Sequence, residues 1–189
     1  MANKQQQNAR LGAIGESYVQ MRLMQQGWDA FNANSTYNNY KSVDIVCLKP
    51  EDDMAWKPRT ALIQVKTTKQ KAFPLGFTID QCLDKEFLKD HIIGPWAFVA
   101  VASEKDMSTF RCYVLTREQV IELAYESHDW YKNKWKREKE ISGSSVAALQ
   151  EEWLRGEIKK AEGETGKHPA FINPLKGVDT HEAWDNIWI

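Results

Sequence analysis

Apolar positions along the chain change from a helical period to short runs of strand length. Residues 9–26 carry apolar side chains at helical spacing and predict a helix that ends at Gly27, a residue suited to the position after a helix. Five short apolar runs have the length of strands. They cover residues 28–32, 43–48, 61–65, 96–102 and 111–115.

The segments between these runs predict turns and further helices. Residues 73–78 are apolar but broken by Pro74 and Gly76, which predicts a short extended segment. Residues 80–92 predict a short helix that Gly94 and Pro95 end. Thr116 and Gln119 have the spacing of a capping box and predict a helix through residue 124.

After residue 126 the composition changes, and we place a domain boundary there. Residues 1–126 form the expected α/β core, and residues 127–189 form a C-terminal extension that packs on it. Within the extension we expect a helix over residues 146–161 and a turn-rich linker over residues 162–169. The tail keeps large apolar residues, so we expect it to dock onto the body; these are Phe171, Trp184, Ile187 and Trp188.

The order of elements indicates the fold class. Helix, three strands, helix, two strands and helix predict an α/β domain with a mixed sheet of about five strands flanked by helices. A helical C-terminal appendage completes it.

Composition limits the compartment and the partners. The longest apolar run, residues 96–102, is far shorter than the roughly 20 residues that span a membrane. The N-terminus lacks the apolar stretch of a secretory signal, and the three scattered cysteines predict buried, reduced thiols. We therefore expect a cytoplasmic protein. The net charge of -1 means that nucleic acid would bind through local basic patches.

Three polar residues interrupt the apolar hairpin of residues 42–69. They are Asp44, Gln64 and Lys66, and Gln64 and Lys66 lie on one face because side chains alternate along a strand. Burying such groups costs several kcal/mol unless they are paired or bind something. The hypothesis is that they bind a divalent metal and a phosphodiester; the alternative is a structural Asp44–Lys66 salt bridge.

Glu16 on the first helix is the fourth candidate. It lies in line with Val19 and Leu23, which we expect to be buried, and near Gly12 and Gly15, which allow close backbone approach. The alternative is a surface glutamate on a helix with a wide apolar face.

Together these residues resemble the PD-(D/E)xK nuclease superfamily. The likeness rests on G-x-x-G-E at residues 12–16, V-D at residues 43–44 and Q-V-K at residues 64–66, and it covers roughly residues 9–125. It is closest to the branch with archaeal Holliday-junction resolvases and modification-dependent restriction endonucleases, in which Gln occurs at the second acidic position. The resemblance implies a restriction-endonuclease-like fold.

The resemblance also implies a role for each residue. Asp44 would be the central ligand of Mg²⁺, with Mn²⁺ as a possible substitute, and the Gln64 amide oxygen and the Val65 carbonyl would add further ligands. Lys66 would orient or deprotonate the attacking water. Glu16 would hold a bound water or a second metal.

Other residues could contact DNA. Lys69 and Lys71 follow the Q-x-K strand. Trp130, Tyr131 and Trp135 alternate with basic residues and could clamp a strand by stacking and charge, although a buried Trp stripe explains them equally well. The basic residues of this segment are Lys132, Lys134, Lys136 and Arg137. The four histidines have no metal-ligand spacing.

Two functions follow from this pattern. The first is a metal-dependent DNA endonuclease of repair, recombination or defence, plausibly a homodimer because cutting both strands with one site per chain usually needs two chains. The second is a catalytically inactive nuclease-like domain that binds nucleic acid or protein. An unrelated α/β protein remains the third alternative.

Overall fold

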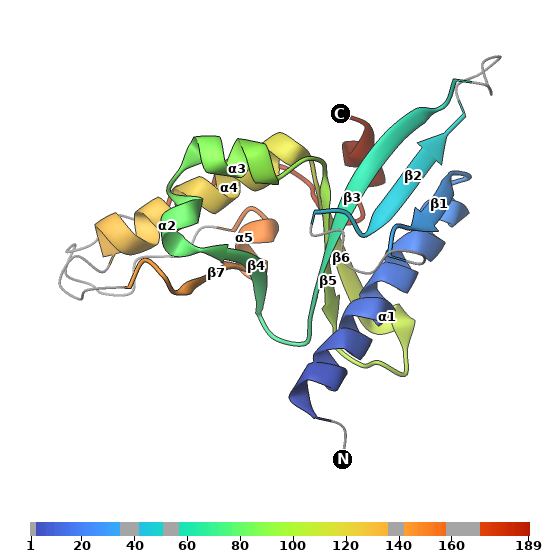
Figure 1. Ribbon diagram of the computed structural model, residues 1–189, viewed down its shortest axis with the longest axis horizontal. Helices are drawn as coiled ribbons and strands as arrows, with labels where there is room; N and C mark the ends of the chain where they lie inside the picture. The colour runs from blue at the N-terminus through green and yellow to red at the C-terminus, as the bar shows by residue number, and fades with distance from the viewer. Residues whose placement is uncertain (1–2, 35–41, 51–56, 136–141, 158–170) are drawn as a thin grey trace.

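A ten-residue strand, β3 (Arg59–Thr68), lies at the centre of the computed structural model, which describes residues 3–34, 42–50, 57–135, 142–157 and 171–189. It pairs antiparallel with β2 (Ile45–Lys49) and parallel with β5 (Trp96–Val101). β1 (Asp29–Asn32) and β6 (Phe110–Leu115) complete a sheet of order β1-β2-β3-β5-β6 (Figure 1). The predicted α/β class with a mixed sheet of five strands is confirmed.

Both faces of β5 are buried, as its continuous apolar sequence predicts. Trp96, Phe98 and Ala100 face one hydrophobic cluster, while Ala97 and Val99 face a second cluster on the other side. The sheet therefore separates two cores. This alternation sets which side of β3 carries Gln64 and Lys66, because these residues are aligned with Trp96 and Phe98.

Helix α1 (Lys4–Gln25) covers the second cluster (Figure 1). It begins earlier than predicted because Asn3 and Gln6 form a capping box. It ends at Gln25, and Gly27 follows the C-cap Gln26 with a left-handed φ of 81°, as expected. Gly15 faces β3 so closely that a Cβ there would collide with the Thr67 side chain. Glycine thus allows the close approach that brings Glu16 near the hairpin.

The other face is covered by the crossover between β3 and β5 and by α4 (Arg117–Asp129). The crossover contains β4 (Ala72–Thr78), α2 (Ile79–Cys82) and α3 (Lys85–His91). The single helix predicted over residues 80–92 is wrong. Asp84 caps α3 by accepting from the backbone N–H of Glu86 and Phe87, both at 3.0 Å, so the chain restarts a helix there. The capping box at Thr116 is confirmed.

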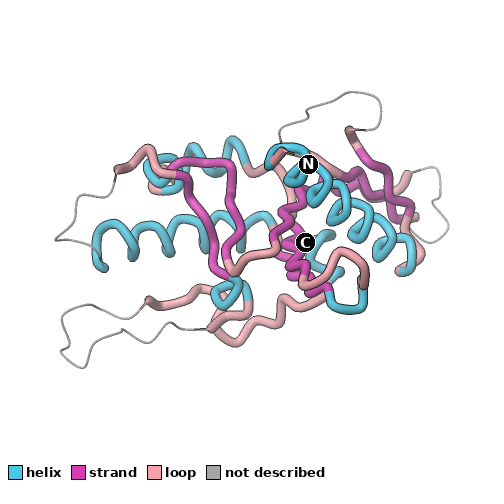
Figure 2. The backbone as a smooth tube through the Cα atoms, turned by 90° about the horizontal axis from the view of Figure 1, so that it is seen from below, coloured by secondary structure: helices cyan, strands magenta, loops and turns pink. Residues whose placement is uncertain are grey.

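The predicted helix over residues 146–161 is also wrong. Its first part is a strand, β7 (Val146–Gln150), which pairs antiparallel with β4 in a separate two-stranded sheet. Only α5 (Glu151–Leu154) is helical in the described part of that range. β4 and β7 are far apart in the sequence but pair in space, and Figure 2 shows the tubes of the two strands side by side.

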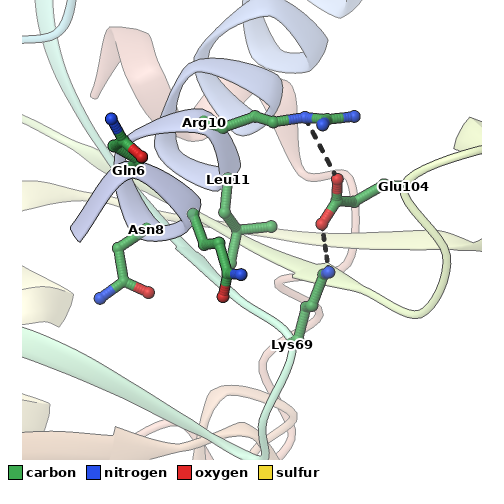
Figure 3. A pocket seen from close by; sticks show the side chains of 7 residues that line it. Gln6, Asn8, Arg10, Leu11, Lys69 and Glu104 are labelled. Atoms are coloured by element: carbon green, nitrogen blue, oxygen red, sulfur yellow. Dashed lines mark ion pairs between the residues drawn. The ribbon is translucent and has the colours of Figure 1, made fainter. Parts of the chain in front are cut away.

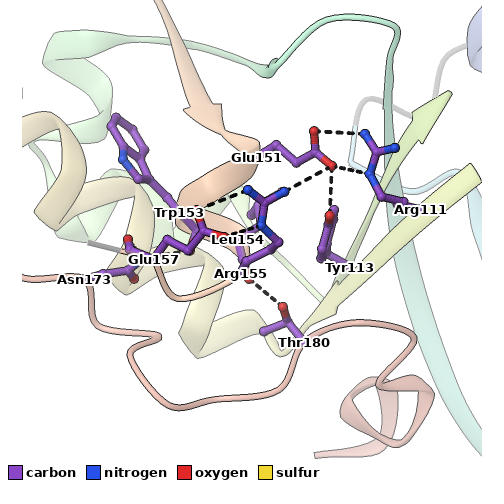
Figure 4. Close-up of polar contacts among 9 residues, drawn as sticks. All are labelled: Arg111, Tyr113, Glu151, Trp153, Leu154, Arg155, Glu157, Asn173 and Thr180. Atoms are coloured by element: carbon purple, nitrogen blue, oxygen red, sulfur yellow. Dashed lines mark hydrogen bonds and ion pairs between the residues drawn. The ribbon is translucent and has the colours of Figure 1, made fainter. Parts of the chain in front are cut away.

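A buried carboxylate fastens this C-terminal region to the main sheet (Figure 4). Glu151 accepts from Arg111 Nε at 2.7 Å and from the Tyr113 hydroxyl at 2.8 Å, both on β6. Arg155 lies 3.7 Å from the same carboxylate. β6 is thereby linked to the start of α5.

The tail docks on the body as predicted. Phe171 packs in the first cluster, while Trp184 and Ile187 of the 3-10 helix η3 (Trp184–Trp188) pack in the second. Two further short elements are the 3-10 turn η1 (Met107–Thr109) and the π-helical turn η2 (Trp130–Trp135). The charged hairpin turn of residues 51–53 and the linker of residues 162–169 lie outside the described residues.

All three cysteines are buried and free, in line with the sequence. Within the described ranges, no helix combines the length and the apolar character needed to cross a bilayer.

Candidate active site

The candidate site lies where β2 and β3 part. The two strands pair from Lys49–Arg59 to Ile45–Ile63, and the Asp44 N–H then donates to the Ile63 carbonyl at 2.9 Å. Asp44 also bonds to the residue after β1, since the Ala33 N–H donates to the Asp44 carbonyl at 2.8 Å. β3 continues beyond this point to Thr68. Asp44 therefore lies next to Gln64, one residue beyond the last paired position of the hairpin.

Asp44 is a buried carboxylate held by several donors. Its Oδ2 accepts from the Val65 backbone N–H at 2.7 Å and from the Gln64 side-chain amide, and its Oδ1 lies 3.3 Å from the Asn34 amide nitrogen. Burial raises the pKa of Asp44, the Val65 N–H opposes that rise, and the nearby Glu16 charge adds to it. A bound cation would relieve both the desolvation and the repulsion.

Glu16 reaches the site through a chain of amides. Asn32 at the end of β1 donates from its Nδ2 to Glu16 Oε2 at 2.8 Å, and the Asn32 Oδ1 accepts from the Asn34 N–H at 2.8 Å. Asn34 in turn contacts Asp44. The structure thus links Glu16 to Asp44 through Asn32 and Asn34.

Lys66 lies on the same face of β3 as Gln64, and both side chains line one cavity. Burial lowers the pKa of Lys66, and the Asp44 charge partly opposes this. The ammonium has no ion pair within 4 Å to a described carboxylate, and it lies 5.0 Å from the centre of the Trp96 ring. Asp44 and Lys66, both in the described part of the chain, therefore do not form the direct salt bridge of the alternative explanation.

The proposed ligand residues are Glu16, Asp44, Gln64 and Val65, and they offer oxygen atoms of the kind that Mg²⁺ prefers. Asp44 and Glu16 supply carboxylates, and Gln64 has an amide oxygen. The Val65 N–H points to Asp44, and because the N–H and C=O of a strand residue face the same side, its carbonyl faces that side too. The Gln64 amide now presents its nitrogen to Asp44, so ligation would require the amide to turn over.

This donor set is sparse for a metal. Among the described residues, no group of three His, Cys, Asp or Glu side chains is close enough to hold an ion. A cation here would depend on the amide, the carbonyl and outside oxygens. Phosphate oxygens of a substrate are one source of such ligands, so the set fits Mg²⁺ best with substrate present.

Lys69 and Lys71 follow the site on the chain. Lys69 forms an ion pair with Glu104, which also lies 3.5 Å from Arg10 of α1, and the three residues line a pocket of about 660 Å³ (Figure 3). Pairing with Lys69 keeps the pKa of Glu104 below its usual range. The Lys71 side chain is exposed. Both lysines remain predicted DNA contacts.

The basic and aromatic segment after α4 is described only in part. Trp130 is buried against Trp153 and Phe171, so of the two alternatives the buried stripe holds for this residue. Lys132 forms an ion pair with Asp80. The side chain of Lys134 and residues 136–137 lie outside the described part of the structure.

Comparison with known proteins gives no relatives: no family model, curated protein or solved structure matches this chain. Function is therefore inferred from the residues of the site. Sequence reasoning missed Asn32 and Asn34, whose sequence signal is that of ordinary strand-end and turn residues. It also missed the aromatic residues that line the cavity beside Lys66, because they come from three separate elements, β4, α3 and β5.

Proposed function

We propose that this protein is a metal-dependent DNA endonuclease that hydrolyses phosphodiester bonds with Mg²⁺, as its resemblance to PD-(D/E)xK nucleases implies. The observation that carries the proposal is the meeting of Asp44, Gln64 and Lys66 at the parting of β2 and β3, with Glu16 coupled to Asp44. A carboxylate with a raised pKa beside a lysine with a lowered pKa is a perturbed pair of the kind that marks catalytic sites.

Each residue has a part in the proposed reaction. When bound, the cation supplies Lewis acidity and neutralises charge on the phosphate. Asp44 and the Val65 carbonyl would hold it, and Glu16 would add negative charge on the side of α1. Lys66, whose lowered pKa increases its neutral fraction near physiological pH, accepts a proton from the attacking water or donates a hydrogen bond to the phosphate.

The second candidate, a nuclease-like binding module without catalysis, is favoured by one observation. Gln64 brings no charge, and its amide is already hydrogen-bonded to Asp44. A module of this kind would bind DNA without needing a cation.

Cleavage of supercoiled, linear and branched DNA with Mg²⁺, Mn²⁺ or a chelator separates the two candidates. We expect cleavage with either cation and none with the chelator. Asp44→Asn is expected to lower the rate more than about 100-fold, since loss of groups outside the coordination sphere alone costs about 10–100-fold. Asp185→Asn is the matched control, because Asp185 is exposed on η3.

Binding without cleavage under all of these conditions would favour the binding module. Equal rates for the wild type and Asp44→Asn would rule out the assigned site even if cleavage occurs. Sedimentation of the protein with and without DNA tests the proposed homodimer.

A further inference from the structure

The cavity beside Lys66 has a lining that the proposed hydrolysis does not use. It measures about 290 Å³ and shares Gln64 and Lys66 with the candidate site. Its other walls come from the end of β4, from α2 and α3, and from the start of β5. The volume is just below the roughly 300–1,000 Å³ found for small-molecule sites, which suits one planar ring system.

Aromatic rings dominate this lining. Phe77 and Phe87 meet edge to face, with ring centres 5.7 Å apart and an angle of 89° between their planes. His91 stacks on Phe87 at 3.8 Å, and Trp96 lies 6.2 Å from Phe77. Phe77 and Phe87 are only half-buried, and His91 is exposed. A flat ligand placed in this corner could stack on one ring and meet the edge of another.

The cavity also offers polar groups of both kinds. The Gln81 Oε1 accepts from the Thr78 N–H at 2.9 Å, which leaves its amide nitrogen as a donor. The His91 Nδ1 lies 2.8 Å from the Phe87 carbonyl and so carries a proton, which leaves Nε2 as an acceptor in the neutral ring. A donor and an acceptor beside aromatic walls match the edge and the faces of a nucleobase.

Gly76 brings the backbone of β4 against the Lys66 side chain in the cavity lining. Its φ of 87° is left-handed, and a Cβ there would lie 3.8 Å from Lys66 Nζ. A side chain at this position would be strained by the left-handed backbone, although its Cβ would meet Lys66 only at an ordinary van der Waals distance. β4 is irregular here, since its pairing with β7 shifts between Pro74 and Thr78.

We infer that the cavity receives one unstacked base of the DNA strand, next to the phosphodiester held at Asp44 and Lys66. The inference rests on the proposed endonuclease function and narrows its substrate class to DNA with an unpaired or extruded base. Extruding a base is least costly where it is already mismatched or unpaired, so such DNA is selected. Stacking on an aromatic ring then holds the base whatever its identity.

Binding of three duplexes tests this inference, with wild-type protein and a chelator that prevents cleavage. One duplex is fully paired, one has a single unpaired adenine, and one has an abasic site at the same place. We expect the unpaired adenine to bind at least about fivefold more tightly than the abasic site, as one stacked base predicts. With 2-aminopurine in place of the adenine, fluorescence should change on binding.

The double variant Phe77→Leu and Phe87→Leu keeps apolar side chains but removes the stacking faces. We expect it to bind the adenine and abasic duplexes equally, whereas Phe31→Leu, an exposed aromatic of β1 outside the cavity, should keep the preference. Circular dichroism checks that the double variant is folded. If the double variant does not fold, His91→Ala replaces it, because His91 is exposed. We expect this single substitution to lower the preference for the adenine duplex over the abasic duplex.

The outcomes separate this inference from the proposed function. Cleavage with Mg²⁺ but equal binding of all three duplexes overturns the base pocket and leaves the endonuclease. A base preference that depends on Phe77 and Phe87, with no cleavage in Mg²⁺ or Mn²⁺, overturns the endonuclease and leaves a base-binding module. Absence of DNA binding overturns both.

Discussion

The buried Asp44 carboxylate is suited to binding a cation, but in its charged form it lowers the stability of the folded protein. Three donors hold its carboxylate, yet burial and the Glu16 charge still raise its pKa. Because the folded pKa is above the unfolded value, the folded chain binds the extra proton over the range between them. The stability that this residue contributes is therefore present at low pH and is lost as the pH rises through the folded pKa.

Asp44→Asn should remove this penalty. We expect the variant without metal to be at least as stable as the wild type at pH 7, although most substitutions destabilise by about 0.5–3 kcal/mol. The new amide oxygen can take the Oδ2 position and accept from the Val65 N–H and the Gln64 amide, while Asn34 can turn its amide oxygen toward the new nitrogen. Urea unfolding from pH 4 to 8 with a chelator measures the effect. A loss of more than about 1 kcal/mol in the free energy of unfolding at pH 7 would contradict the view that the charged Asp44 destabilises the folded protein.

Lys66 should control the pH dependence of cleavage. Burial lowers its pKa, against the opposing Asp44 charge, so its neutral form becomes more populated as the pH rises through the lowered value. We expect the rate to rise over that range and Lys66→Arg, which stays protonated, to lose about 100-fold or more and the rise with it. Lys105→Arg on an exposed loop is the control. An unchanged profile in Lys66→Arg would exclude Lys66 as the proton acceptor.

Asp44, Gln64 and Lys66 are predictable from sequence because each is a polar residue within an apolar strand pattern. Asn32 and Asn34 are not, because asparagine near a strand end is a usual turn residue and its role here depends on Glu16 arriving from α1. Only the three-dimensional approach at Gly15 brings these residues together.

At the scale of elements, the sequence predicts those with a local signal and misses those set by distant partners. The strands of the main sheet and the cap of α4 follow from apolar runs and from Thr116–Gln119. β7 does not, because residues 146–154 also have apolar positions at helical spacing. Pairing with β4 makes it a strand, with Ala147 and Leu149 buried on one face, so tertiary contacts override local preference.

Glu151 should stabilise this arrangement. Burial opposes the low pKa of Glu151, and hydrogen bonds from Arg111 and Tyr113 produce it. A carboxyl whose folded pKa is lowered contributes stability above its unfolded pKa and loses it as the pH falls through the folded value. We expect Glu151→Gln to lower the free energy of unfolding by about 1–3 kcal/mol at pH 7, and by less near pH 3.

Urea unfolding of both proteins at the two pH values measures this difference. Glu152→Gln is a matched control, since Glu152 is the adjacent residue of α5 and is half-exposed. A difference that does not shrink in acid would show that the Glu151 charge is not what stabilises the contact.

For the whole molecule, a net charge of -1 leaves DNA binding to local patches. The basic segment after α4 is predicted to be one of them. Replacing Lys132, Lys134, Lys136 and Arg137 with Gln should reduce the slope of log affinity against log salt by about one for each phosphate that the variant no longer neutralises. Lys105→Gln with Lys176→Gln, both exposed elsewhere, is the control. An unchanged slope would show that these basic residues do not neutralise DNA phosphates and belong to a solvated surface.

The charge of the whole site leads to the last prediction. In the described part of the chain, Asp44 and Glu16 are the carboxylates of the site, so the free protein should bind Mg²⁺ weakly and bind it more tightly when phosphate oxygens of DNA complete the shell. By linkage, Mg²⁺ then raises DNA affinity by the same factor. Gln64→Glu adds a carboxylate next to Asp44 and removes the amide that now bonds to it.

We therefore expect Gln64→Glu to bind Mg²⁺ about tenfold more tightly without DNA, to keep or raise activity, and to unfold more easily when metal is absent. Titration calorimetry with and without DNA gives the affinities, and urea unfolding with a chelator gives the stability. The two readouts must move in opposite directions, because the same added charge repels Asp44 in the empty site and attracts the cation. Unchanged metal affinity, with no cleavage by either protein, would leave Asp44 and Gln64 as a hydrogen-bonded pair in a domain that only binds.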